Sequence, residues 1–142
     1  MNELHLSGTA IAVATLANFF VGFLWYSVIF QKAWVAEMKI PMDQKPTAGM
    51  MVKSLGMNLV GCFLLAFVFA NNTAAWSFVP NIDQMGTGMS IFNAAVFTWL
   101  GFFVLVDLNT VAFEGKSWKL FAINTSYHFT MVLVSAIILH TL

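Results

Sequence analysis

The sequence predicts an all-α integral membrane protein, a four-helix transmembrane bundle, on three observations. Long apolar runs cover residues 7–30, 50–71, 88–110 and 119–140 of a 142-residue chain. Each reaches the ~20 residues that a helix needs to cross ~30 Å of hydrocarbon. The composition is 60% hydrophobic and 8% charged, whereas a soluble domain carries roughly 25% charged residues. The third observation is that lysines occur only after the first run and between the third and fourth runs. Because the runs are continuous rather than alternating, they favour helices over a β-barrel.

The lysines also predict the orientation of a single transmembrane domain that covers residues 1–142. Both lysine-bearing segments should face the cytoplasm by the positive-inside rule. We therefore expect a multi-pass protein of the cell inner (plasma) membrane with both termini on the outer side. The lysines are Lys32, Lys39, Lys45 and Lys53 in the first segment and Lys116 and Lys119 in the second.

The first run should be a retained transmembrane helix, because its leader lacks the positive charge of a signal peptide and its apolar stretch is too long for one. Trp25 and Tyr26 lie near its cytoplasmic end, where amphipathic rings collect. Residues 31–39 alternate apolar and charged side chains, which predicts a short interfacial helix that Pro41 and Pro46 end. The second run contains the only cysteine, Cys62, which we interpret as a buried small hydrophobe.

The third run carries Asp107, and we place it on one face with Asn93, Val96, Leu100 and Phe103 by the helical spacing of three and four. A tight turn at residues 113–118 should make the third and fourth helices antiparallel neighbours. The fourth run carries His128 about ten residues from its start and therefore near the midplane.

A short match between the two halves predicts two parallel helical-hairpin repeats with a pseudo-twofold axis along the membrane normal. Each half has Lys-x-x-x-x-Asn at the start of its second helix, Lys53 to Asn58 and Lys119 to Asn124. Chance similarity between apolar helices is the alternative. If the repeat is real, Asn58 lies opposite Asn124 near the axis.

Asp107 and His128 are the clearest candidates for function, because intramembrane ionisable groups are costly. Asp107 could form an ion pair with Lys53 or Lys119 that ties helices together, or it could be a proton or cation site. His128 could hydrogen-bond to a facing helix, act as a protonatable relay, or bind a metal or haem. Asn124, His128 and Tyr127 lie along one side of the fourth helix, and the helix asparagines are suited to interhelical hydrogen bonds.

Other site chemistries lack their motifs. The sequence contains no nucleophile elbow, P-loop, dinucleotide fingerprint, His-Glu-x-x-His or Cys-x-x-Cys. We therefore expect no catalytic residues, no metal site and no cofactor. The net charge of +0 gives no reason to expect a nucleic-acid partner.

The segment Phe-Glu-Gly-Lys-Ser-Trp-Lys-Leu-Phe at residues 113–121, followed by Asn124, Tyr127 and His128, is a fairly specific pattern. Together with Lys32-Ala33-Trp34, it resembles the bacterial membrane family catalogued as domain of unknown function 1761. The resemblance implies a small four-helix membrane protein without a settled activity. The matching positions suggest a cytoplasmic collar, in which Glu114 forms a salt bridge to a lysine and two tryptophans lie at headgroup depth. The same groups could instead bind a lipid headgroup or small anion. The collar residues are Lys32, Trp34, Lys53, Glu114, Lys116, Trp118 and Lys119.

The expected function is a non-enzymatic structural or accessory membrane subunit, with membrane lipids as neighbours and a homo-oligomer or larger complex as its assembly. The alternative is a small transporter or channel for a proton, cation or small metabolite that uses Asp107 and His128. An enzyme that acts on lipid or quinone through His128, Tyr127 and Glu114 ranks third.

Overall fold

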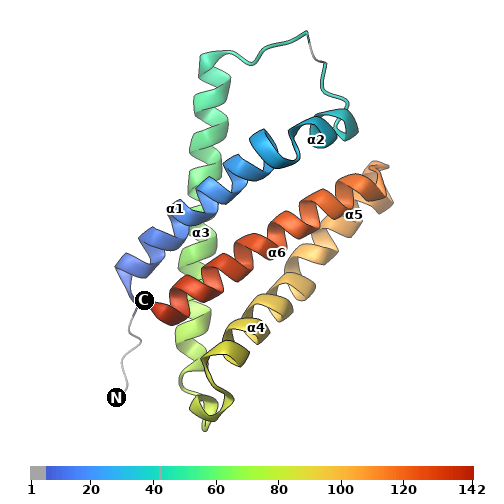
Figure 1. The fold of residues 1–142 in the computed structure, drawn as a ribbon. Helices are drawn as coiled ribbons and strands as arrows, with labels where there is room; N and C mark the ends of the chain where they lie inside the picture. Colours follow the sequence, from blue (N-terminus) through green and yellow to red (C-terminus); the bar gives the residue numbers. More distant parts are fainter. Residues whose placement is uncertain (1–5, 42) are drawn as a thin grey trace.

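The computed structural model describes residues 6–41 and 43–142, and every regular element in them is a helix (Figure 1). The all-α membrane-bundle prediction is confirmed, because four helices are long and apolar enough to cross a membrane. These spans are Gly8–Ile29, Ala48–Trp76, Thr87–Glu114 and Trp118–Thr141. The first comprises α1 (Gly8–Leu24) and the π-helical turn η1 (Trp25–Ile29), the second is α3 (Ala48–Trp76), and the fourth is α6 (Trp118–Thr141). The third comprises α4 (Thr87–Thr98), the π-helical turn η3 (Trp99–Phe103) and α5 (Val104–Glu114).

Hydroxyl side chains begin three of these helices. The hydroxyls of Ser7, Thr47 and Ser117 accept hydrogen bonds from backbone N–H groups in the first turns of α1, α3 and α6. Each bond satisfies one of the N–H groups that a helix start leaves without a partner. Gly115 ends α5 at φ 64°, a left-handed conformation that glycine adopts without steric cost. The predicted turn at 113–118 is therefore a glycine-ended helix followed at once by a capped one.

The two short elements lie in the connections. The short helix α2 (Gln31–Glu37) follows η1, close to the predicted residues 31–39, and the 3₁₀ turn η2 (Ile82–Met85) precedes α4. In Figure 1, α2 lies at the same end of the molecule as the turn between α5 and α6. The lysine-bearing segments therefore share one end of the bundle.

α6 is the central helix of the bundle. It packs against α1 on one side and against α4 and α5 on the other, whereas α3 contacts mainly α1 and crosses behind α1 and α6 (Figure 1). Val132 and Ala136 of α6 form an apolar cluster with Phe69 of α3 and Ala95 of α4. The predicted pseudo-twofold arrangement stays a prediction, although α3 and α6, its proposed equivalents, differ in their main neighbours.

The first half of α3 has little protein around it. Residues 48–61 are all exposed, and the buried side chains of α3 begin at Cys62. A Cβ built on Gly49, Gly56 or Gly61 would meet no atom within 4 Å. This half of the helix is therefore largely open to the surroundings of the protomer.

The two π-helical turns set which side chains face α6. In each, an N–H donates to the carbonyl five residues earlier, from Phe30 to Trp25 in η1 and from Val104 to Trp99 in η3. One additional residue in a turn rotates the following face by roughly 100° relative to an α-helix.

The helix face predicted for the third span is wrong at Leu100, which lies within the π-helical turn η3. Leu100, expected beside Asp107, is 49% exposed. The residues directed at α6 are instead Ala95, Trp99, Phe103 and Asp107, spaced by four. A spacing of four stays on one face here because the π-helical turn is wider than an α-helical one.

Candidate functional site

Asp107 of α5 and His128 of α6 meet inside the bundle. The distance from Asp107 Oδ2 to His128 Nδ1 is 2.8 Å. The carboxylate side chain is 4% exposed and the imidazole 22%. A charge at the bilayer centre costs ~2.5–3.5 kcal/mol on insertion scales, and a hydrogen-bonded partner of opposite charge offsets part of that cost. The sequence identified both residues, and the structure brings them together.

The lysine partners considered for Asp107 are wrong. Lys53 is exposed near the start of α3, and Lys119 Nζ lies 3.8 Å from Glu37 Oε1. A helix rises ~1.5 Å per residue, so His128 lies roughly 13 Å along α6 from Lys119. Asp107 is therefore paired well below the end of the bundle where the lysines lie.

Aromatic rings surround the imidazole of His128. The ring centroids of Phe103 and Tyr127 lie 4.9 Å and 5.4 Å from it. The ring of Tyr127 in turn packs edge-on against Tyr26 at 4.9 Å, and Tyr26 Oη donates to Asn124 Oδ1 at 3.0 Å. The predicted stripe of Asn124, Tyr127 and His128 is thus continuous with a tyrosine from η1. The sequence placed Tyr26 at the membrane interface and gave no sign of this hydrogen bond.

Two tryptophans join the π-helical turns to the first third of α6. Trp25 Nε1 donates to the backbone carbonyl of Ile123 at 3.1 Å, and Trp99 Nε1 donates to that of Thr125 at 2.9 Å. These acceptors lie on either side of Asn124. Because each tryptophan begins its π-helical turn, the turns direct the indole N–H groups at the helix that carries His128. Neither contact was predicted.

Gly22 allows a close approach of α1 to α6 and α3. A Cβ built on Gly22 would lie 2.8 Å from Tyr127 Oη and 3.6 Å from Asn58 Nδ2. Asn58 is exposed, and its Oδ1 accepts a hydrogen bond from the Cys62 thiol at 3.1 Å. The conditional prediction that Asn58 lies opposite Asn124 stays a prediction; in the structure Asn58 lies beside Tyr127, and Asn124 accepts a hydrogen bond from Tyr26.

A cavity of about 290 Å³ adjoins this site. Its α3 wall consists of Asn58, Gly61, Cys62 and Leu65, and its opposite wall of Phe103, Tyr127 and Met131. Phe103 and Tyr127 are the same two rings that flank His128. The cavity therefore reaches the immediate neighbours of the Asp107–His128 pair.

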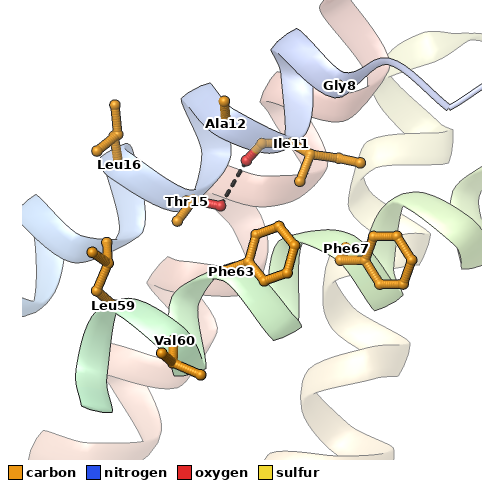
Figure 2. Close-up of a pocket in the computed structure, with 9 residues that line it drawn as sticks. All are labelled: Gly8, Ile11, Ala12, Thr15, Leu16, Leu59, Val60, Phe63 and Phe67. Atoms are coloured by element: carbon orange, nitrogen blue, oxygen red, sulfur yellow. Dashed lines mark hydrogen bonds between the residues drawn. The ribbon is translucent and has the colours of Figure 1, made fainter. Parts of the chain in front are cut away.

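A larger groove of about 590 Å³ lies between α1 and α3 (Figure 2). Leu16, Leu59, Val60, Phe63 and Phe67 give it an apolar lining. The hydroxyl of Thr15 donates to the Ile11 carbonyl within α1 at 2.7 Å, as Figure 2 shows. With no free polar group from Thr15, this groove has the chemistry of a packing surface for apolar chains.

Among the residues predicted for a collar at this end of the bundle, Lys119 pairs with a different acid, Glu37. Glu37 of α2 accepts a short hydrogen bond from the Ser117 hydroxyl and pairs with Lys119, and these contacts join α2 to the start of α6. Glu114, the acid expected in this role, is exposed at the last turn of α5. The reason is that α2 places Glu37 beside the N-terminus of α6.

The remaining collar residues are dispersed. Lys32 and Lys53 are exposed, Lys116 is half-buried, and Trp118 is 66% exposed with its ring against Phe121. Trp34 packs edge-on against Tyr26 at 5.3 Å, so it belongs to the aromatic cluster of the site. Over residues 6–41 and 43–142, no three histidine, cysteine, aspartate or glutamate side chains group as metal ligands would.

The fold and the site define a class: a small multi-span α-helical membrane protein with a buried carboxylate–imidazole pair. The family described as "Protein of unknown function (DUF1761)" matches residues 9–140, so the chain belongs to that family. No curated protein and no solved structure matches the chain.

Proposed function

We propose that the protein is a small transporter whose Asp107–His128 pair takes up and releases a proton within the membrane. The observation that carries this proposal is the 2.8 Å contact between a carboxylate and an imidazole, with Asp107 almost fully buried inside a candidate span. Ionisable groups inside a membrane are costly, and they commonly mark proton relays and ion pathways. No enzymatic activity is part of the proposal.

The pair has the charge balance that such a role requires. With one proton bound, the pair is neutral overall, either as imidazolium and carboxylate or as imidazole and carboxylic acid. Release of that proton leaves one net negative charge. The His128 side chain is partly exposed whereas Asp107 is enclosed, so the imidazole is the more accessible member of the pair. Asp107 is therefore the positioning partner and His128 the group that exchanges the proton.

The lysine distribution supports an orientation for this transporter. The shared end of α2 and the α5–α6 turn should face the cytoplasm of the inner membrane by the positive-inside rule, with both termini outside. Exchange through His128 would then occur a little under halfway along the fourth span from its cytoplasmic end.

Proton flux into liposomes tests this function. The purified protein is reconstituted around a pH-sensitive dye, and flux is driven by an imposed potential. We expect flux above that of protein-free liposomes, and its loss in Asp107→Asn and His128→Ala. The matched controls are Asp83→Asn, an exposed aspartate in η2, and His140→Ala, which lies on the same helix as His128. Flux equal to that of protein-free liposomes, or equal in wild type and both site variants, would reject the proposal.

A second function, that of an accessory subunit, is favoured by the exposed first half of α3. Residues 48–61 include the polar side chains of Ser54 and Asn58, which a partner helix or a second copy would cover. Gly56→Leu tests this role, because a side chain at Gly56 meets nothing within the protomer. Loss of a stoichiometric partner, or of a homo-oligomer, from mild-detergent preparations of this variant would support it. A wild-type protein that purifies as a lone monomer would exclude it.

A further inference from the structure

The cavity beside the Asp107–His128 pair has two hydrogen-bond donors without partners. Tyr127 is 7% exposed, yet within the described part of the chain its hydroxyl makes no hydrogen bond. The amide Nδ2 of Asn58 also has no acceptor among the described residues, while its Oδ1 accepts from Cys62. Asn58 is exposed, so the cost of burial without a hydrogen bond falls on Tyr127, and its hydroxyl indicates a missing partner at the cavity wall.

The two donors lie close to each other. Both are near the position that a Cβ on Gly22 would take, at 2.8 Å from Tyr127 Oη and 3.6 Å from Asn58 Nδ2. Gly22 itself does not line the cavity, but both donor residues do, so a molecule in the cavity can contact both residues.

The rest of the cavity wall is apolar and includes an adaptable side chain. Leu65, Phe103 and Met131 complete most of it, and methionine adapts its shape to an apolar ring or chain. The carboxylate of Asp107 is engaged with His128. The wall can therefore donate hydrogen bonds to an acceptor oxygen. The Asp107 carboxylate is not free to bind a cation there.

The cavity is accessible from the side of the bundle. One wall belongs to the stretch of α3 where the exposed residues 48–61 meet the first buried residue, Cys62. In a span, such exposure is to the hydrocarbon of the membrane. Its volume of about 290 Å³ lies at the lower end of the ~300–1,000 Å³ of typical ligand pockets and suits a single ring or the start of a chain.

We propose that this cavity binds a membrane-soluble molecule that presents a carbonyl oxygen on an apolar body. Quinones and lipid esters share this chemistry. The carbonyl oxygen accepts hydrogen bonds from Tyr127 Oη and Asn58 Nδ2, and the apolar body packs between Leu65, Phe103 and Met131. Binding needs no proton exchange at His128, so this proposal stands apart from the transport function.

The test is calorimetric titration of the full-length protein in detergent micelles at a fixed pH and without a gradient. The probes are a decyl-substituted benzoquinone, a fatty-acid methyl ester, and decylbenzene, which lacks oxygen. We expect saturable binding of at least one carbonyl probe and weaker binding of decylbenzene. Binding of the benzoquinone alone assigns a quinone, and binding of the ester alone assigns a lipid ester.

Three variants assign the binding to the two donors. Asn58→Leu and Tyr127→Phe should each lower the affinity for the carbonyl probe about three- to tenfold, the loss expected for one hydrogen bond. Asn71→Leu is the matched control, because Asn71 lies on the same helix outside the cavity and donates to the Phe67 carbonyl. Asn58 is exposed, so its variant remains informative if Tyr127→Phe does not fold. Absence of saturable binding, equal affinity for decylbenzene, or wild-type affinity in Asn58→Leu would overturn the proposal.

Discussion

Removal of one member of the Asp107–His128 pair should destabilise the protein more than removal of both. His128→Phe leaves a carboxylate that is 4% exposed and has lost its partner at 2.8 Å. Breaking a buried pair from one side costs ~3–5 kcal/mol in soluble proteins, whereas replacing both members with apolar groups is often neutral. The carboxylate can also take up a proton, which lowers this cost. We therefore expect His128→Phe to lower the free energy of unfolding by about 2–3 kcal/mol. The double variant Asp107→Leu/His128→Phe should lower it by less.

The assay is a double-mutant cycle on the free energy of unfolding, measured by titrating SDS into mixed micelles. The four proteins are the wild type, Asp107→Leu, His128→Phe and the double variant. The structure predicts a coupling energy of about 1–3 kcal/mol, because the two side chains share one hydrogen bond in a buried setting. Interhelical hydrogen bonds in membranes average ~0.6 kcal/mol, so a larger value indicates a contribution from charge. If the effects of the two single variants on the free energy of unfolding add up to that of the double variant, the pairing is refuted.

Two further predictions concern the packing around the site. Gly22→Ala should destabilise by about 1–3 kcal/mol, because its Cβ would lie 2.8 Å from Tyr127 Oη, while Gly61→Ala, with open space around it, should change stability by under about 0.5 kcal/mol. The same SDS titration measures both, and equal effects would contradict the close approach of α1 to α6. Trp99→Phe should cost about 0.5–1.5 kcal/mol, because the bonds of its indole N–H to Thr125 are lost, and an unchanged stability would contradict that contact.

The four spans and the site residues Asp107, Asn124, Tyr127 and His128 could be predicted from the sequence. Hydropathy over ~20 residues reports span length directly, and Asp107 and His128 are conspicuous because few ionisable groups lie inside the runs. The partner of each residue could not be predicted. A constant helical period places Leu100 beside Asp107, and the π-helical turn at Trp99–Phe103 changes that register without a recognised sequence signal.

The collar and the helix asparagines show a second limit. Glu37 and Glu114 have similar sequence contexts, and only the packing of α2 against the start of α6 selects Glu37 as the partner of Lys119. The position of Asn58 depends on how steeply α3 crosses α1 and α6, which hydropathy does not report. Long-range packing, rather than local propensity, decides both cases.

The central claim is that His128 exchanges a proton while Asp107 holds it in place. Its most direct measurement is solid-state ¹⁵N NMR of histidine-labelled protein in bilayers, with His128 assigned by comparison with His128→Gln. We expect the ring-nitrogen signals of His128 to report both a protonated and an unprotonated imidazole, and Asp107→Asn to change the signal of Nδ1, which lies 2.8 Å from Asp107 Oδ2. A His128 signal from one protonation state alone, or one that Asp107→Asn leaves unmoved, would contradict it.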